Sequence, residues 1–165
     1  MPFTPYHLGP GLFLKALAPR AFSFTAFAAT QVVIDVETLV HIVRHEWPLH
    51  RTAHTFLFGS LIGFGVAGVL YLAATLSRRW TVSTLPVLTA EVSLLGLVVG
   101  GWLGGSTHAL LDGLMHSDIR PFAPFADVNP LLGSISLGML HGSCMVLGVV
   151  AFIWLTARAA LWRAG

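Results

Sequence analysis

Long runs of apolar residues restrict the folds open to this chain more than any other feature. Each run holds at least the ~20 residues that an α-helix needs to cross the apolar core of a bilayer. A backbone in lipid must satisfy its own hydrogen bonds, so such runs cross as helices. The 165-residue chain is 55% hydrophobic and 10% charged, which leaves little for a soluble domain. We therefore predict an all-α, integral membrane helical bundle of four to five helices, forming a single domain over residues 1–165. The apolar runs cover residues 21–42, 55–76, 85–115 and 131–162.

The first apolar stretch, residues 8–18, is too short to span a membrane. At ~1.5 Å per residue a helix of this length covers about half of a ~30 Å apolar core. Pro19 then stops it. We expect a short half-crossing N-terminal helix that enters the membrane and returns. No basic stretch followed by an apolar segment and a small-residue cleavage site precedes it, so we expect no removable signal peptide.

Charge and cysteine content exclude several classes of partner and site. The net charge of +2 comes from scattered Lys and Arg rather than from a basic cluster, so we expect no nucleic-acid partner. No motif signals a protein partner, and the lipid bilayer is the expected surrounding. The single cysteine, Cys144, cannot form an internal disulfide or a cysteine zinc cluster. Any metal must therefore be bound by His, Asp and Glu.

A polar stripe lies at the end of the 85–115 run. His108, Asp112 and His116 are spaced four residues apart, which places them on one face of a helix. Imidazole and carboxylate together suit Zn²⁺ and other divalent metals. Ionisable groups beside lipid are energetically costly, so their presence indicates a functional role. The stripe therefore predicts a metal-binding edge. The alternative is that these residues only cap a helix end at the membrane surface.

Glycines in two of the runs predict where helices pack closely, because small residues let membrane helices approach one another. The first set is Gly59, Gly63, Gly65 and Gly68, and the second is Gly96, Gly100 and Gly104. The second set has the same spacing as the polar stripe and leads into it.

Alternating helix directions bring further candidate ligands to the same membrane face. The end of the 21–42 run, the start of the 55–76 run and the end of the 85–115 run then lie together. His50 and His54 are four residues apart, so we place both on one helical face, where they can chelate one ion. His7 joins this face if the N-terminal helix returns. The candidates are His7, Asp35, Glu37, His50, His54, His108, Asp112, His116 and Asp118.

These candidates exceed the three protein ligands of a single catalytic zinc, so the sequence is compatible with one or two ions. A pair of divalent ions ~3.5–4 Å apart suits the hydrolysis of phosphate esters. Arg51, between two of the histidines, carries a planar fork that suits phosphate, with an interfacial anchor as the alternative. We place the remaining polar residues outside the ligand set: His41 and His45 at the interface or behind the ligands, His141 in helix packing and Glu91 at a solvated helix end.

Together these motifs resemble those of the bacterial inner-membrane proteins known as membrane-bound metal-dependent hydrolases, the YdjM-like group. The resemblance is carried by Pro-Tyr-His7-Leu-Gly, Ile34-Asp35-Val36-Glu37, His50-Arg51-x-x-His54-Thr55 and Thr107-His108-Ala-Leu-Leu-Asp112 with a following Pro-Phe loop. It implies a multi-pass inner-membrane protein with a metal centre at His7, Asp35, His50, His54, His108 and Asp112. The chain departs from the family pattern at Ile34, Glu37, Thr38 and Thr52, and its His50 and His54 lie one residue closer together than in the family, so it resembles a divergent branch or one with a shifted metal geometry. A weaker likeness to all-α zinc phospholipases favours phosphoester chemistry.

The distribution of basic residues predicts the orientation in the membrane, because positive residues concentrate on the cytoplasmic side. The metal face carries fewer of them, so we expect it outside the cytoplasm. The two sets are Arg44, Arg51 and Arg120 on the metal face, and Lys15, Arg20, Arg78, Arg79, Arg158 and Arg163 on the other.

The function that the sequence favours is a metal-dependent hydrolase at the outer face of the bacterial inner membrane. We expect a phosphoester or lipid-like substrate cleaved by metal-activated water, with zinc as the preferred ion. The alternatives are a non-catalytic metal-binding or ion-transport protein, and a haem protein ligated through His54 and His108 or His141. We assign Glu37, His116 and Arg51 to catalysis and His7, Asp35, His50, His54, His108 and Asp112 to the metal.

Overall fold

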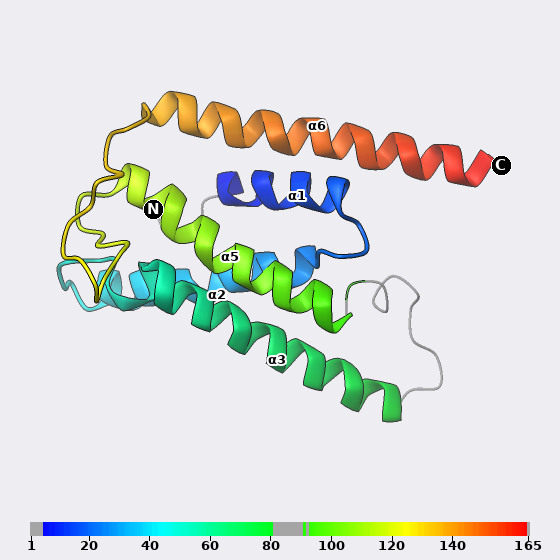
Figure 1. Ribbon diagram of the computed structural model, residues 1–165, viewed down its shortest axis with the longest axis horizontal. Coiled ribbons are helices and arrows are strands. Elements are labelled where there is room, and N and C mark those ends of the chain that lie inside the picture. Colours follow the sequence, from blue (N-terminus) through cyan, green and yellow to red (C-terminus); the bar gives the residue numbers. More distant parts are fainter. Residues whose placement is uncertain (1–4, 81–90, 92, 165) are drawn as a thin grey trace.

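Five α-helices make up most of this computed structural model, which describes residues 5–80, 91 and 93–164 (Figure 1). No strand occurs among those residues, so the predicted all-α class is confirmed. Four of the helices are long and apolar enough to cross a membrane. In chain order the elements are the 3-10 turn η1 (Pro5–His7), α1 (Leu8–Leu17), α2 (Phe24–Val43), the 3-10 turn η2 (Thr52–His54), α3 (Phe56–Trp80), α5 (Leu94–Met115) and α6 (Leu137–Ala164).

All four long helices begin later than the apolar runs predict, and the difference is largest for α5 and α6. α5 begins at Leu94 because the Ser93 hydroxyl accepts the backbone N–H of Gly96 and caps the helix. Most of the predicted segment before Ser93 lies outside the described residues. α6 begins at Leu137 rather than at residue 131, because the preceding segment forms turns that include Gly133 at φ +72°.

Helix α5 lies against both α2 and α3, and glycines permit these contacts. A Cβ atom at Gly63 of α3 would lie 2.0 Å from the carbonyl oxygen of Gly101 on α5. On another side of α5, a Cβ atom at Gly100 would lie 2.2 Å from the carbonyl oxygen of Ser23, which caps α2. Backbones this close leave no room for a side chain, as small-residue packing in membranes requires.

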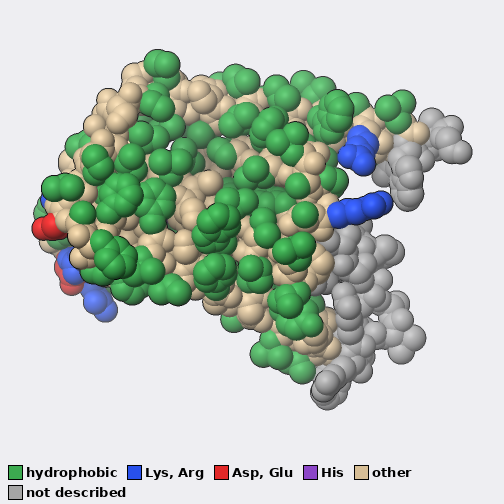
Figure 2. Space-filling model, in the orientation of Figure 1, with side chains coloured by type: hydrophobic (Ala, Val, Ile, Leu, Met, Phe, Trp, Pro, Cys, Tyr) green, Lys and Arg blue, Asp and Glu red, His purple; other side chains and the backbone are tan. Residues whose placement is uncertain are grey.

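Only part of the predicted glycine packing is found on α3. Gly59 and Gly63 lie against α5, whereas a Cβ atom at Gly65 or Gly68 would meet nothing within 4 Å. The rest of the surface is apolar: Figure 2 shows hydrophobic side chains along the visible face, with the charged side chains near its two ends. This distribution is what a bilayer selects, since exposed apolar residues then face lipid.

The short N-terminal helix was predicted correctly and links α6 to the bundle. α1 lies between α6 and the other helices in Figure 1, and it ends just before Ala18 and Pro19. A Cβ atom at Gly9 would lie 2.0 Å from the carbonyl oxygen of Cys144 on α6, so the two helices touch through their backbones. With ten residues, α1 is too short to cross the membrane itself.

Glu91 is not the solvated helix end that the sequence predicts. Its carboxylate pairs with Lys15 at the end of α1, and only 16% of either side chain is exposed. The Ser23 hydroxyl and the Thr25 backbone N–H also donate to Glu91, at 3.2 Å and 3.3 Å. Lys15 donates in addition to the Pro19 carbonyl at 2.8 Å. This pair therefore ties α1 and the start of α2 to the segment before α5.

Candidate metal centre

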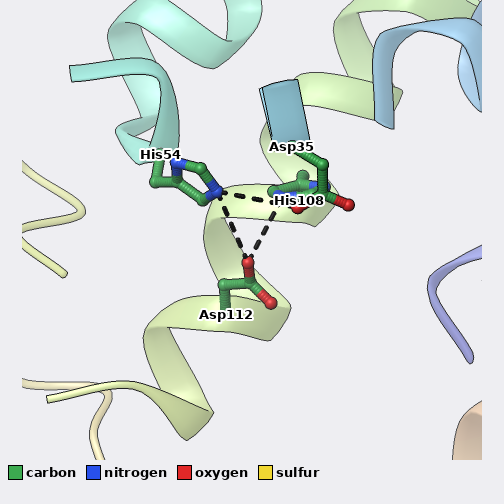
Figure 3. Close-up of side chains that lie close together, drawn as sticks. All are labelled: Asp35, His54, His108 and Asp112. Atoms are coloured by element: carbon green, nitrogen blue, oxygen red, sulfur yellow. Dashed lines mark ion pairs between the residues drawn. The ribbon is translucent and has the colours of Figure 1, made fainter. Parts of the chain in front are cut away.

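Four candidate ligands from three segments meet at one end of the bundle (Figure 3). Asp35 comes from α2, His54 from η2, and His108 and Asp112 lie one turn apart on α5. Their exposed fractions are only 5%, 0%, 0% and 3%. One ligand atom from each lies within 4.8 Å of all the others. The predicted convergence of these helix ends is confirmed for these four residues.

The donor atoms surround a common point. The Nε2 atom of His108 lies 3.2 Å from Asp112 Oδ2 and 3.6 Å from Asp35 Oδ1. The Nε2 atom of His54 lies 3.8 Å from the same Asp112 oxygen and 3.9 Å from the same Asp35 oxygen. Two imidazoles and two carboxylates form a donor set that zinc and similar divalent ions accept.

One buried atom tests whether this set fits a metal. The Nε2 atom of His108 is buried, yet it forms no hydrogen bond with any described residue, because the nearby Asp112 oxygen does not lie in hydrogen-bond geometry. Buried polar atoms in folded proteins nearly always have a partner. A nitrogen lone pair aimed at two carboxylates without a hydrogen bond fits coordination of a cation.

The opposite nitrogen of each imidazole is held by an oxygen acceptor. His54 Nδ1 lies 3.1 Å from Glu37 Oε2, and His108 Nδ1 hydrogen-bonds to the amide oxygen of Gln31. Both acceptors require a hydrogen on Nδ1, which leaves Nε2 of each ring with the lone pair that an ion would need; on His54 that atom also lies 3.2 Å from the Thr38 hydroxyl. Such partners fix the ring orientation in metal sites. Gln31 was not among the predicted residues, although it stands one helical turn before Asp35 in an apolar run.

Glu37 has a supporting position. Besides His54, its carboxylate accepts the backbone N–H groups of Arg51 at 3.0 Å and Ala53 at 3.1 Å. These bonds hold the connection between α2 and α3 in the form that presents His54. Glu37 therefore already has three donors, and its predicted catalytic role stays a prediction.

The charge state of His54 follows from its carboxylate neighbours. Burial acts to lower the pKa of His54, but the nearby carboxylates of Asp35, Glu37 and Asp112 together raise it to about 9. Without an ion, His54 therefore carries a proton at neutral pH. A metal and this proton compete for the same nitrogen.

A second group of three candidate ligands, His50, His116 and Asp118, lies next to the first. His50 Nδ1 lies 3.0 Å from Asp118 Oδ1, and the His50 ring lies edge-on to the His54 ring at 4.7 Å. The backbone N–H groups of Leu49 and His50 also donate to Asp118. Burial would raise the pKa of Asp118, but these hydrogen bonds lower it, so it stays ionised near neutral pH.

Two local predictions for the histidines are wrong. His116 does not extend the stripe of His108 and Asp112, because α5 ends at Met115 and His116 has an extended backbone. Its ring stacks on that of His50 instead, with centroids 4.3 Å apart. Burial and the His50 charge lower the pKa of His116. His50 and His54 share no helical face either, since only a 3-10 turn precedes α3; the folded loop brings them together.

His7 lies at the edge of the four-residue group. It is buried in η1, and its Nε2 atom lies 3.2 Å from Asp112 Oδ1 without forming a hydrogen bond. Its ring stands edge-on to that of His108, with centroids 5.0 Å apart. The N-terminal segment therefore does return to the site as expected, and ligation by His7 stays a prediction.

The remaining candidates lie outside the cluster. The Arg51 guanidinium pairs with Glu46 at 3.1 Å and donates to the Pro48 carbonyl at 3.0 Å, so it is engaged by the loop. His41 also bonds to Glu46, at 2.8 Å. His141 stacks on Tyr6, with centroids 4.3 Å apart, in agreement with its expected packing role.

No known protein family, curated protein sequence or solved structure matches this chain.

Proposed function

We propose that this chain is a membrane-embedded, metal-dependent hydrolase that acts on a lipid-like or phosphorylated substrate. Its divalent ion, with zinc as the first choice, would be held by Asp35, His54, His108 and Asp112. The observation that carries the proposal is the buried His108 Nε2 atom, which has no hydrogen bond and is 3.2 Å and 3.6 Å from two carboxylate oxygens. An ion bound there supplies Lewis acidity that activates water.

The surrounding side chains have roles that follow from their contacts. Glu37 and Gln31 fix the imidazoles of His54 and His108, and Asp118 does the same for His50. His116, half-buried and stacked on His50, would accept a proton during hydrolysis. The adjoining group that includes His116 would hold a second ion if the enzyme uses two.

The lipid-like substrate is supported by an apolar cavity beside the site. A cavity of about 550 Å³ lies between α1 and α6, and Tyr6, Leu12 and Met145 are among its lining residues. Its lining includes Tyr6 and Leu8, the two residues on either side of His7, and the His7 ring contacts that of His108. A lipid tail in this cavity would direct its head towards the metal centre. By the distribution of basic residues, we propose that this centre lies at the outer face of a bacterial inner membrane.

Full burial of the four ligands favours a second candidate function, a structural metal site. Structural zinc sites are closed by four protein ligands, whereas catalytic sites keep a position open. In that case the ion would stabilise the bundle and no substrate would be cleaved. The two functions differ in what metal removal does to activity and to unfolding.

The deciding experiment is elemental analysis of protein purified in detergent without chelators. Wild type should contain about one or two equivalents of a divalent metal, and a His108→Ala/Asp112→Ala variant should contain none. His141→Ala serves as the control, because His141 stacks on Tyr6 away from the cluster. A metal-free wild type would overturn both functions. Loaded protein that is stable but hydrolyses neither phosphomonoesters nor phospholipids would leave only the structural site.

A further inference from the structure

Two arginines lie at the end of the bundle opposite the metal centre. Arg20 belongs to the connection between α1 and α2, and Arg158 lies in the last part of α6 (Figure 1). Both side chains are exposed. On the face that Figure 2 shows, basic side chains project at this end with no acidic side chain beside them.

No side-chain carboxylate neutralises this pair. All seven acidic residues of the chain belong to the described part, and none of them forms an ion pair with Arg20 or Arg158. Each already has a basic or imidazole partner: Asp35 and Asp112 in the metal centre, Glu37 with His54, Glu46 with His41 and Arg51, Glu91 with Lys15, Asp118 with His50, and Asp127 with Arg120.

The two arginines share a concave surface. They line one cavity of about 640 Å³ together with Leu155 and Leu161 of α6. They also line an adjoining cavity of about 400 Å³, formed with the turn after α1. The surface therefore combines two unneutralised guanidinium groups with an apolar helix wall. Guanidinium binds phosphate oxygens in pairs, and the apolar wall suits the upper part of an acyl chain.

We propose that Arg20 and Arg158 bind the headgroup of an anionic phospholipid in this cavity. The site is separate from the metal centre and does not depend on the proposed hydrolase function. Basic pockets between membrane helices bind anionic lipids where a leaflet carries negative charge. A phosphatidylglycerol headgroup supplies a phosphate without a compensating cation, whereas phosphatidylcholine carries its own cation. The site therefore selects phosphatidylglycerol.

The experiment measures binding of both lipids to delipidated full-length protein in detergent by native mass spectrometry. At ~1 kcal/mol for each arginine, wild type should prefer phosphatidylglycerol over phosphatidylcholine by about 30-fold. Arg20→Gln/Arg158→Gln should reduce that preference to near unity. Arg44→Gln/Arg120→Gln removes the same charge from the opposite end and should keep the preference. Unchanged thermal unfolding of each variant in detergent shows that it is folded.

Three results would overturn the proposal. The first is a wild type without preference for phosphatidylglycerol. The second is an equal loss in the Arg44→Gln/Arg120→Gln control, which would show that net charge alone attracts the lipid. The third is an unchanged preference in folded Arg20→Gln/Arg158→Gln, which would place the lipid at another site. If Arg20→Gln/Arg158→Gln is unfolded, Arg20→Lys/Arg158→Lys keeps the charge, and its expected result is a weaker but measurable preference.

Discussion

Glu37 Oε2 lies 3.1 Å from His54 Nδ1, while the same carboxylate accepts the backbone N–H of Arg51 at 3.0 Å. One α2 side chain therefore fixes both the ring of a candidate ligand and the loop that carries it. The ligand and its support come from different elements, so the position of His54 depends on the packing of α2 against the start of α3.

Removal of this support should weaken metal binding while every ligand remains. In Glu37→Ala, we expect the affinity for zinc to fall by about 10- to 100-fold, as is typical when a partner of a ligating histidine is lost. A competition titration with a chelating dye measures the change. Glu46→Ala removes an exposed carboxylate that bonds His41 instead, and should bind zinc as wild type does. Equal affinity of Glu37→Ala and wild type would contradict the supporting role.

Zinc uptake should release a proton from His54. Its pKa of about 9 means that the metal-free protein carries this proton at pH 7, whereas the ion requires the neutral ring. Affinity should therefore rise with pH up to about 9, by about tenfold per unit for one proton. Calorimetry at pH 7 in two buffers of different ionisation enthalpy measures the proton. Equal binding heats in the two buffers would show that zinc does not displace a proton from His54.

Close packing of α3 on α5 should make Gly63 sensitive to the smallest substitution. A Cβ atom there would lie 2.0 Å from the Gly101 carbonyl oxygen, so Gly63→Ala forces the helices apart and should cost about 1–3 kcal/mol. Gly65→Ala is the matched control on the same helix, because its Cβ atom would meet nothing. Thermal unfolding in detergent should show a lower midpoint for Gly63→Ala only. A similar fall in both variants would contradict the role of this contact, because helix propensity favours Ala over Gly and cannot lower the midpoint.

Replacing only one partner of the Lys15–Glu91 ion pair should destabilise the protein more than replacing both. Lys15→Met leaves a largely buried carboxylate without its cation and should lower the unfolding midpoint. Adding Glu91→Gln to Lys15→Met removes the unpaired charge, and the amide can still accept from Ser23 and Thr25. The double variant should therefore be more stable than Lys15→Met alone. A double variant that is less stable would show that Glu91 acts independently of Lys15.

The sequence was sufficient to predict the long helices and the meeting of four candidate ligands, because these depend on apolar length, residue spacing and the alternating direction of the helices. Apolar length determines which segments cross a membrane, and the spacing of His108 and Asp112 determines that they share a face of α5. The sequence also predicted that these two residues would meet Asp35 and His54, since helices of alternating direction bring their ends together.

The predictions that were wrong depended on where helices begin and end, or on contacts between segments. His116 keeps the spacing of the stripe, but the chain leaves the helix at Met115 and places the ring on His50. Glu91 was assigned to solvent because Lys15, its partner, is distant in sequence. Gln31 was overlooked because a single amide in an apolar run does not reveal that a histidine from α5 will bond to it.

Asp35 and Gln31 lie on α2, whereas His108 and Asp112 lie on α5, much later in the chain. During synthesis α2 must enter the bilayer before these partners have been made, carrying a carboxylate and an amide into lipid at a cost of a few kcal/mol. Stable insertion of α2 therefore depends on the arrival of α5, and truncation before residue 108 would leave a helix that the membrane holds weakly. We therefore expect insertion of this bundle to be complete only once α5 has joined α2.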